Sequence, residues 1–373
     1  MKRNILFWFS CWSVLTLLFL PFPFVFFPKT GILLSESILP LNELICSWLG
    51  INVRDSFLVS DSLAFYSTAL ILGVLSLLIM IFIYWKGKKY LPAVQKVLFF
   101  TLVLFLSYFL IRYGLDKLFG VQFYTPAANT LHTPVGQLGK DILFWTSMGT
   151  STFYNQFMAI TEISAGILIL FNRTRFLGLI VGFGVLLNIF AINIGFDITV
   201  KYLSGLLFFC CLICLCFYSS NIRFLLGRTV SEKSVPHVSG IYIFVLFLPF
   251  LLDLSVTYWN IKSKDSGKSY TVESVSGISN LMSTEELVRI HFHPEGYFIT
   301  ENKQQRFTSY AMKNNGNLVV IDKQPVFISI EENRLLWKEN KTEIVWNIKE
   351  TDLKKMVLKQ DKTHWYVEAL IPR

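Results

Sequence analysis

Residues 97–119 read VLFFTLVLFLSYFLIRYGLDKLF, with no charged residue before Arg112. A transmembrane helix needs about 20 predominantly apolar residues, and this stretch is long enough. Six other stretches meet or nearly meet the same requirement: 5–27, 63–85, 154–171, 176–194, 200–219 and 240–259. We therefore expect an α-helical integral membrane protein with about seven spans.

The composition changes sharply along the chain. Of its 373 residues, 53% are hydrophobic and 16% are charged, whereas roughly a quarter are charged in an ordinary globular domain. The long apolar runs end near residue 258, and the rest resembles a soluble sequence. We predict four regions: a two-span hairpin with an outside loop (1–95), a four-helix membrane bundle (96–228), a seventh span (229–260) and a soluble β domain (261–373).

The net charge of +9 comes from basic residues that sit at the ends of apolar segments. These are Lys86, Lys88, Lys89, Arg173, Arg175, Arg223 and Arg228. Such positions are typical of cytoplasmic loops beside spanning helices, so we exclude nucleic acid as the partner. The N-terminus is then cytoplasmic, and seven spans place the C-terminal domain outside the cytoplasmic (inner) membrane. The first apolar run is long and lacks an A-x-A-like site, which favours a retained anchor over a cleaved signal peptide.

The C-terminal region alternates apolar and polar residues with a period of two, which is typical of strands. Examples are 288–293, 297–300, 318–321, 326–330, 343–347 and 365–370. Asn315-Gly316 lies between two such runs and is a hairpin signal. Eight or nine short strands with brief turns predict a small antiparallel barrel or sandwich.

One pair of histidines and one pair of cysteines are candidate chemical sites. His291 and His293 would share one face of a strand, and a solvated strand face is the alternative that we prefer to a metal site. Cys211 and Cys214 form a C-x-x-C within the apolar run 200–219. We expect these thiols to pack as small core residues, because redox pairs usually sit near water or a helix N-terminus.

Polar residues gather within the spans between 97 and 219, where each ionisable group is costly. Given the predicted orientation, Arg112 and Glu162 fall in the outer half of neighbouring helices. We predict an internal polar pocket with Glu162, Arg112 and Lys117 as catalytic residues. Its binding residues would be Tyr113, Asp116, Gln122, Trp145, Asn188, Asn193, Asp197 and Lys201. The alternative is that Arg112 and Glu162 neutralise each other and only hold the bundle together.

The stretch Arg112–Phe123 resembles the R-Y-G-x-x-K-x-F-x-x-Q-F pattern of the DoxX/DoxD-like membrane family. The resemblance continues through LFWTSMG at 143–149, through Glu162 and Gly166, and through FDITVK at 196–201. It covers roughly residues 98–228. A histidine common in the sixth span of that family is replaced here, near Gly205, which counts against a proton relay in that helix.

This resemblance implies a four-helix bundle in the cytoplasmic membrane and, for DoxD-type members, electron transfer to quinone. We therefore expect a quinone-linked oxidoreductase, or a membrane subunit of one, that carries no cofactor motif of its own and uses a membrane quinone. The alternative is a non-enzymatic scaffold or a binder of a lipid or other hydrophobic ligand, whose β domain docks an extracytoplasmic partner. A transporter is a third possibility, although no inverted repeat is detectable.

Overall fold

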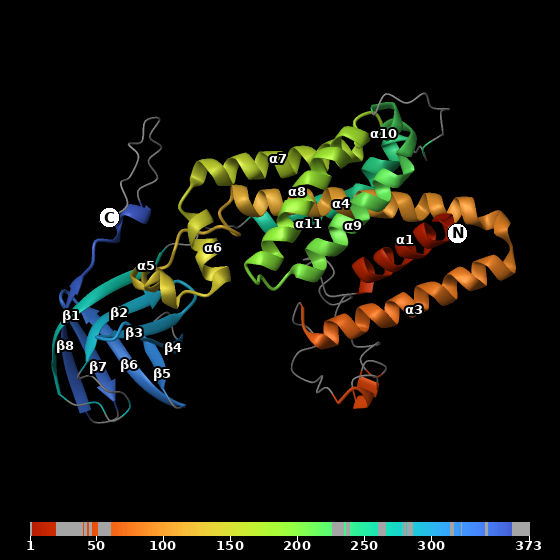
Figure 1. Cartoon of the computed structure of the whole chain (residues 1–373). Helices are drawn as coiled ribbons and strands as arrows, with labels where there is room; N and C mark the ends of the chain where they lie inside the picture. The colour runs from red at the N-terminus through yellow and green to blue at the C-terminus, as the bar shows by residue number, and fades with distance from the viewer. Residues whose placement is uncertain are drawn as a thin grey trace. The chain divides into compact units, whose positions relative to one another are not determined.

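The computed structural model describes residues 2–19, 61–225, 239–259, 266–277, 286–313, 317–321, 323–339 and 342–359, together with 40, 43–44, 47–50, 235, 279 and 281. The chain forms two compact units (Figure 1), each made of two segments. The helical unit comprises Met1–Leu118 and Phe157–Ile261. The barrel unit comprises Phe119–Gln156 and Lys262–Arg373.

Apolar helices build the helical unit. They are α1 (Lys2–Phe19), α3 (Leu63–Lys86), α4 (Leu91–Leu118), α7 (Thr152–Leu170), α8 (Arg175–Gly195), α9 (Lys201–Phe217), α10 (Ser219–Leu225) and α11 (Gly240–Trp259). Among the described residues, five of them (α3, α4, α7, α8 and α11) are long and apolar enough to cross a membrane. A sixth results if α9 and α10, which are bent by 78° at their junction, count as one crossing. Helix α1 is apolar but shorter. The prediction of an α-helical protein is thus confirmed, with five to six helices that could cross a membrane.

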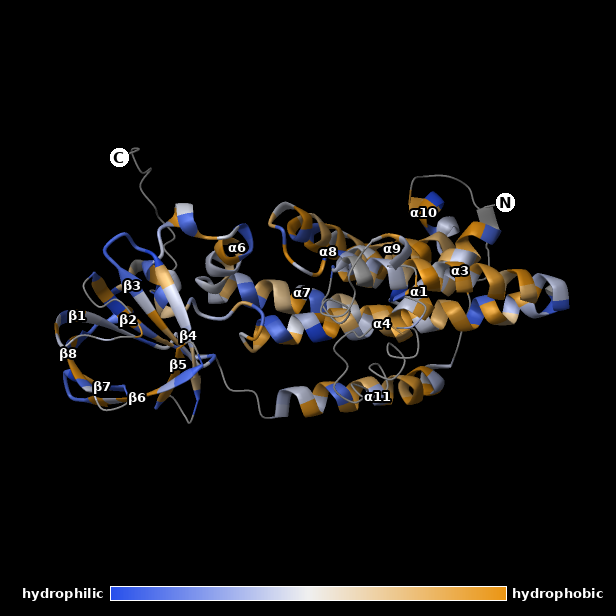
Figure 2. Cartoon of the chain, turned by 90° about the horizontal axis from the view of Figure 1, so that it is seen from below, coloured by the Kyte–Doolittle hydropathy of each residue, from blue (hydrophilic) through white to orange (hydrophobic). Residues whose placement is uncertain are grey.

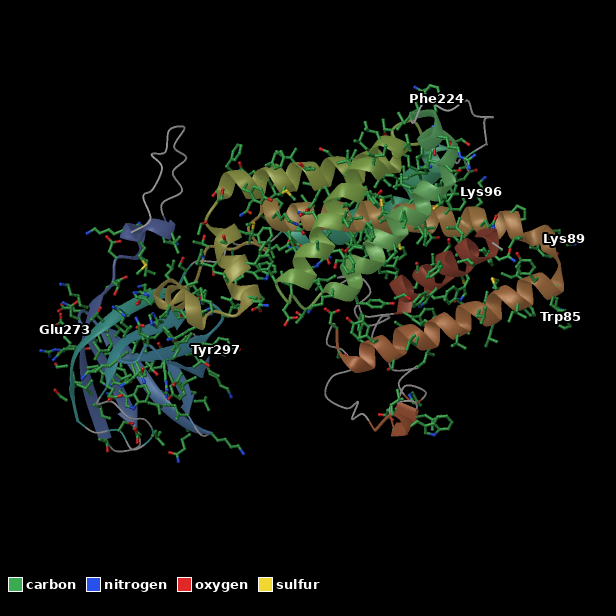
Figure 3. The ribbon with its side chains drawn as sticks, in the orientation of Figure 1. Trp85, Lys89, Lys96, Phe224, Glu273 and Tyr297 are labelled. Carbon is green, nitrogen blue, oxygen red and sulfur yellow. The ribbon has the colours of Figure 1, made fainter. Side chains whose placement is uncertain are left out.

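Helices α3 and α11 consist mostly of hydrophobic residues (Figure 2), and many of these side chains are exposed. Leu70 on α3 and Ile241 on α11 are 66% and 74% exposed. Exposed apolar surface on this scale is unusual for a soluble monomer and is expected for helices in contact with lipid. The exposed ring of Trp85 lies at the end of α3, near Lys89 in the following turn (Figure 3). The Lys86 ammonium is 5.2 Å from the centroid of this ring. Aromatic and basic residues together are typical of a membrane interface.

Two pairs of neighbouring helices in the unit are antiparallel. On α1, the indoles of Trp8 and Trp12 donate hydrogen bonds to the carbonyls of Gly73 at 3.1 Å and of Ala69 at 2.8 Å on α3, so α1 and α3 are antiparallel. Helices α8 and α9 are antiparallel too, with the Cys211 thiol donating to the carbonyl of Leu179 at 3.3 Å. Helices α4 and α11, in contrast, are parallel, as the contacts of Phe105 and Tyr108 with Phe250 and of Arg112 with Tyr258 show.

Arg175 does not lie in a solvated loop, as we predicted from its place in the turn 172–175. Its side chain is fully buried and donates to the carbonyls of Ile169 at 2.8 Å and Leu170 at 2.9 Å. These carbonyls belong to the last turn of α7, where backbone carbonyls have no hydrogen-bond donor within the helix. A guanidinium can satisfy several such oxygens at once, so Arg175 caps the end of α7.

The barrel unit contains a closed up-and-down barrel of eight strands (Figure 1). They are β1 (Lys268–Ser276), β2 (Leu287–His293), β3 (Tyr297–Asn302), β4 (Phe307–Lys313), β5 (Leu318–Ile321), β6 (Gln324–Glu331), β7 (Arg334–Glu339) and β8 (Thr342–Glu350). Each strand pairs antiparallel with the next, and β1 pairs with β8 to close the sheet. The predicted antiparallel β domain is confirmed, and of the two predicted forms it takes the barrel.

Side chains fill the barrel interior. The fully buried rings of Trp337 and Trp346 are stacked with centroids 5.2 Å apart, and Phe298 lies against both. Small barrels of this strand number are wide enough for packed side chains or for one small ligand. Here the indole pair occupies the interior, so ligand sites are to be sought on the outer surface of the barrel.

Most of the predicted strands match the structure. The predicted runs 288–293, 297–300, 318–321, 326–330 and 343–347 fall within β2, β3, β5, β6 and β8. The run 365–370 and the Asn315-Gly316 turn lie outside the described residues. The strands on either side of that turn, β4 and β5, do pair antiparallel.

The connection between α4 and α7 packs on the barrel. We call residues 124–146 the covering segment; it contains α5 (Ala128–His132), η2 (Val135–Gln137) and the start of α6 (Lys140–Gly149). The amide of Ala128 donates to the carbonyl of Ser266 at 2.8 Å, and the His132 ring lies 5.2 Å from the His291 ring. The covering segment therefore conceals part of the outer face of β2.

Candidate functional site

Arg112 lies in a buried ion pair between α4 and α11. Its guanidinium is 3.1 Å from the Asp253 carboxylate, and both side chains are almost fully buried. The Tyr108 hydroxyl donates to the same carboxylate oxygen at 2.5 Å and accepts from Arg112 at 2.7 Å. An unpaired charge would be very costly here, so the three groups stabilise one another and hold α4 against α11.

A second contact joins the same two helices one turn further along. The Tyr258 hydroxyl on α11 is 2.5 Å from the Asp116 carboxylate and 3.0 Å from the carbonyl oxygen of Arg112. Arg112 and Asp116 are four residues apart and share one face of α4. That face is therefore directed at α11.

Lys117 pairs with Glu162 between α4 and α7. The two charged atoms are 2.8 Å apart, and the side chains are 4% and 0% exposed. Gly114 makes this close approach possible, because a Cβ atom there would lie 2.6 Å from Ile163 and 2.8 Å from the backbone oxygen of Ala159. The other carboxylate oxygen of Glu162 is buried and has no hydrogen-bond partner in the described part of the chain.

The structure divides the predicted catalytic residues between two ion pairs. In the alternative that we considered, Arg112 and Glu162 neutralise each other, but Arg112 pairs with Asp253 and Glu162 pairs with Lys117. Tyr113 belongs to the same region, with its ring 5.9 Å from the Lys117 ammonium.

The predicted binding residues do not all join this cluster. Asn188 is exposed and Asn193 is buried. Asp197 and Lys201 form an ion pair of their own at 2.7 Å, with Asp197 79% exposed. Gln122 and Trp145 belong to the barrel unit.

We did not predict Asp253 as a site residue, although the sequence contains a feature that points to it. It is the sole ionisable carboxylate in the apolar run 240–259. An ionisable residue inside a span usually faces the bundle interior and has a partner. Its partner, Arg112, is far away in the sequence. The sequence can therefore predict that Asp253 is buried and paired, but not which residue it pairs with.

A long apolar groove of about 650 Å³ lies between α1, α3, α8 and α9. It follows α9 from Lys201 to Cys216, a rise of about 23 Å at 1.5 Å per residue. Its other lining residues are Leu6, Phe9, Trp12, Ser13, Tyr66, Phe190, Ile194, Tyr202, Gly205, Leu206, Phe209, Leu212 and Ile213. The groove thus has the dimensions of a lipid chain.

The polar groups of this groove are concentrated at one end. Lys201 begins α9, and the rings of Tyr66 and Tyr202 meet edge-on at 5.6 Å beside it. Asp61 fixes this end, because its carboxylate accepts hydrogen bonds from the amides of Lys201 at 2.7 Å and Tyr202 at 2.9 Å. A carboxylate at a helix N-terminus satisfies free amides and complements the helix dipole. The groove is therefore apolar along its length and polar at its mouth.

His291 lies in a buried contact on the outer face of the barrel, not on the solvated strand face that we predicted. Its ring is fully buried beside His132 of the covering segment. Its Nε2 atom is 3.3 Å from a Glu301 carboxylate oxygen, and Arg289 donates to the other oxygen at 2.9 Å. Among the described residues, no group of three or more His, Cys, Asp or Glu is arranged to hold a metal ion.

This contact should make the covering segment sensitive to acid. Burial, helped by the nearby charges of His291 and Arg289, lowers the pKa of His132 below its ordinary 6.5. Although burial opposes the shift, hydrogen bonds from His291 and Arg289 lower the pKa of Glu301 below 4.5. Both groups bind protons more tightly in the unfolded chain, so their contributions to stability are complete at neutral pH and are lost as the pH falls.

We expect amide hydrogen exchange at 128–132, corrected for intrinsic rates, to accelerate as the pH falls below about 6.5 and again below about 4.5. His132→Gln should abolish the acceleration below about pH 6.5 and keep the acceleration below about pH 4.5. If the acceleration below about pH 6.5 persists in that variant, protonation of His132 does not cause it.

These features define a class: the chain is a helical protein in which five to six of the described helices are long and apolar enough to cross a membrane, and it carries an eight-stranded β-barrel unit. It is 37% identical over 133 residues to the uncharacterized protein YwoB of Bacillus subtilis (strain 168), a match that covers 35% of this chain and 82% of that protein. The chain therefore belongs to the same family as YwoB. No family model matches it, and no solved structure matches it.

Proposed function

We propose that this protein binds one amphipathic membrane lipid in the groove between α1, α3, α8 and α9. The groove itself is the observation that carries the proposal, because it is long, apolar and polar at one end only. A lipid chain would lie along α9, and its head group would sit at Lys201 and Tyr66. Burying the chain stabilises the complex by packing, and the hydroxyl and ammonium groups fix its direction.

We further propose a DoxX-like, seven-span topology in the cytoplasmic membrane, with the N-terminus inside and the barrel unit outside. Crossings in this order put α1, α4, α8 and α11 in one direction and α3, α7 and α9 in the other. The antiparallel pairs α1–α3 and α8–α9, and the parallel pair α4–α11, fit that order. The turn between α3 and α4, with Lys86 and Lys89, fits a cytoplasmic turn because it is basic.

A groove-filling substitution tests the lipid proposal. Leu212 lines the groove and is 40% exposed, whereas Leu187 on α8 is similarly exposed, at 44%, but does not line it. Leu212→Trp should lower the amount of co-purifying amphiphile about tenfold, because overpacking costs about 1–3 kcal/mol. Mass spectrometry of gently solubilised protein measures this amount. An equal loss in Leu187→Trp, or no specific amphiphile in the unaltered protein, would contradict the proposal.

A quinone-linked oxidoreductase is the second candidate, and one observation favours it. Glu162 holds a buried carboxylate oxygen that has no partner among the described residues, as a proton-exchanging group requires. A quinone at near-stoichiometric amount in the same mass spectra would favour this function over a plain lipid binder. Lys117→Ala and Glu162→Gln should then abolish turnover while the folded protein stays in the membrane, and unchanged turnover would exclude it.

A further inference from the structure

A separate cavity of about 450 Å³ lies within the barrel unit. One wall is the covering segment, with Asn129, Gln137 and Trp145. The other wall is the outer surface of the barrel, with His293 and Phe307. Its volume falls in the ordinary range of small-molecule sites, and neither the lipid groove nor the buried ion pairs use it.

Aromatic rings form one part of the lining. Tyr124, Trp145 and Phe307 contribute their rings from three separate elements. The Trp145 ring rests on Phe123, with centroids 5.2 Å apart, which restricts its orientation. The faces of aromatic rings are electron-rich and attract the polarised C–H groups of a ligand, as well as cations.

Uncharged hydrogen-bonding groups form most of the rest. Asn129, Thr130, Thr133, Gln137 and Thr146 all line the cavity. Such groups can donate and accept hydrogen bonds with the hydroxyl groups of a ligand.

The charge of the lining restricts the ligand further. Among the described residues that line the cavity, Glu295 is acidic and there is no Lys or Arg. The Nδ1 atom of His293 accepts from the amide of Glu295 at 3.2 Å, which places the proton of the neutral ring on Nε2. The lining therefore disfavours an anion and favours a neutral ligand or a cation.

We propose that this cavity binds a neutral sugar, free or as part of a glycan. A pyranose ring presents a C–H face for Trp145 and, around its edge, hydroxyl groups that can exchange hydrogen bonds with Gln137 and the threonine side chains. An organic cation would use the rings and Glu295 but has no general need for the amide and hydroxyl groups. The number of uncharged polar groups favours the sugar.

The test uses the full chain in lipid nanodiscs, because sugar-headed detergents would compete for the site. Glucose, N-acetylglucosamine, maltose, cellobiose and choline are each titrated up to millimolar concentrations, with saturation-transfer NMR as the readout. We expect at least one sugar to bind, and Trp145→Ala to weaken that binding by at least about tenfold. Trp85→Ala, which removes an exposed tryptophan of the helical unit, should leave it unchanged.

A second pair of variants removes the cavity without removing an aromatic anchor. Thr146→Trp fills the cavity from α6, whereas Ser147→Trp places the same ring at the next position, which is exposed and does not line the cavity. Sugar binding should be lost in the first variant and kept in the second. Three outcomes would overturn the proposal: no sugar binds, sugar binding survives Thr146→Trp, or choline alone binds and Glu295→Gln abolishes that binding.

Discussion

Asp253→Ala is expected to lower the free energy of unfolding of the helical unit by about 3–5 kcal/mol. The substitution leaves the Arg112 guanidinium buried on α4 without its counter-ion, and the Tyr108 hydroxyl without its acceptor. A charge inside an apolar bundle is costly when it is unpaired. Unfolding with rising SDS in mixed micelles, followed by helical circular dichroism, measures the loss.

Two further variants separate the ion pair from the packing around it. Tyr108→Phe removes one hydrogen bond and should cost only about 1 kcal/mol. The double substitution Arg112→Met with Asp253→Leu removes both charges and should recover most of the stability, since apolar pairs often replace buried ion pairs at no cost. A loss below about 1 kcal/mol in Asp253→Ala would mean that Arg112 is solvated and that this pair does not hold α4 to α11.

The helices could be predicted because span length and apolar content are local properties of the sequence. The stretch predicted at 97–119 lies almost wholly in α4, and that predicted at 240–259 matches α11. Pairing between helices is not local. Arg112 had several carboxylates at a similar predicted depth, and only the packing of α4 between α7 and α11 decides that it meets Asp253 while Lys117 meets Glu162.

The same limit applies to the barrel unit. Alternation predicted strands such as β2 and β8, because an alternating strand shows its buried face in the sequence. The segment 268–276, which became β1, is rich in serine and threonine and gives a weak alternation. Closure of β1 on β8, and burial of His291 beneath His132, depend on segments far apart in the chain. A polar strand face covered by another segment looks identical in the sequence to one that is solvated.

The lipid groove could not be predicted from the sequence either. Its lining along the middle of α9 consists mainly of leucine, phenylalanine and isoleucine, as does any surface that faces lipid. The sequence does not show whether such a face is convex or hollowed, because that depends on the positions of α1 and α8. Gly205 was noted only because it replaces an expected histidine, and the structure places it in the groove lining, where a Cβ atom would lie 2.9 Å from the Phe190 ring.

Lys117→Ala should also cost about 3–5 kcal/mol, because it leaves the fully buried carboxylate of Glu162 without a cation. The same titration in mixed micelles measures the loss. Glu162→Gln removes the carboxylate charge that faces the buried Lys117 ammonium and should cost a similar amount. The double substitution Lys117→Met with Glu162→Leu should return close to the original stability, so the losses caused by the two single substitutions should not add.

The double variant also separates a structural role of this pair from a chemical one. If the pair only holds α4 to α7, the double variant keeps its bound amphiphile and whatever activity the protein has, because the two helices remain packed at Gly114. If Glu162 exchanges protons, the double variant folds but loses turnover, since no carboxylate remains. Single losses that add up in the double variant would contradict the structural role, because they would mean that the 2.8 Å contact contributes nothing to the folded protein.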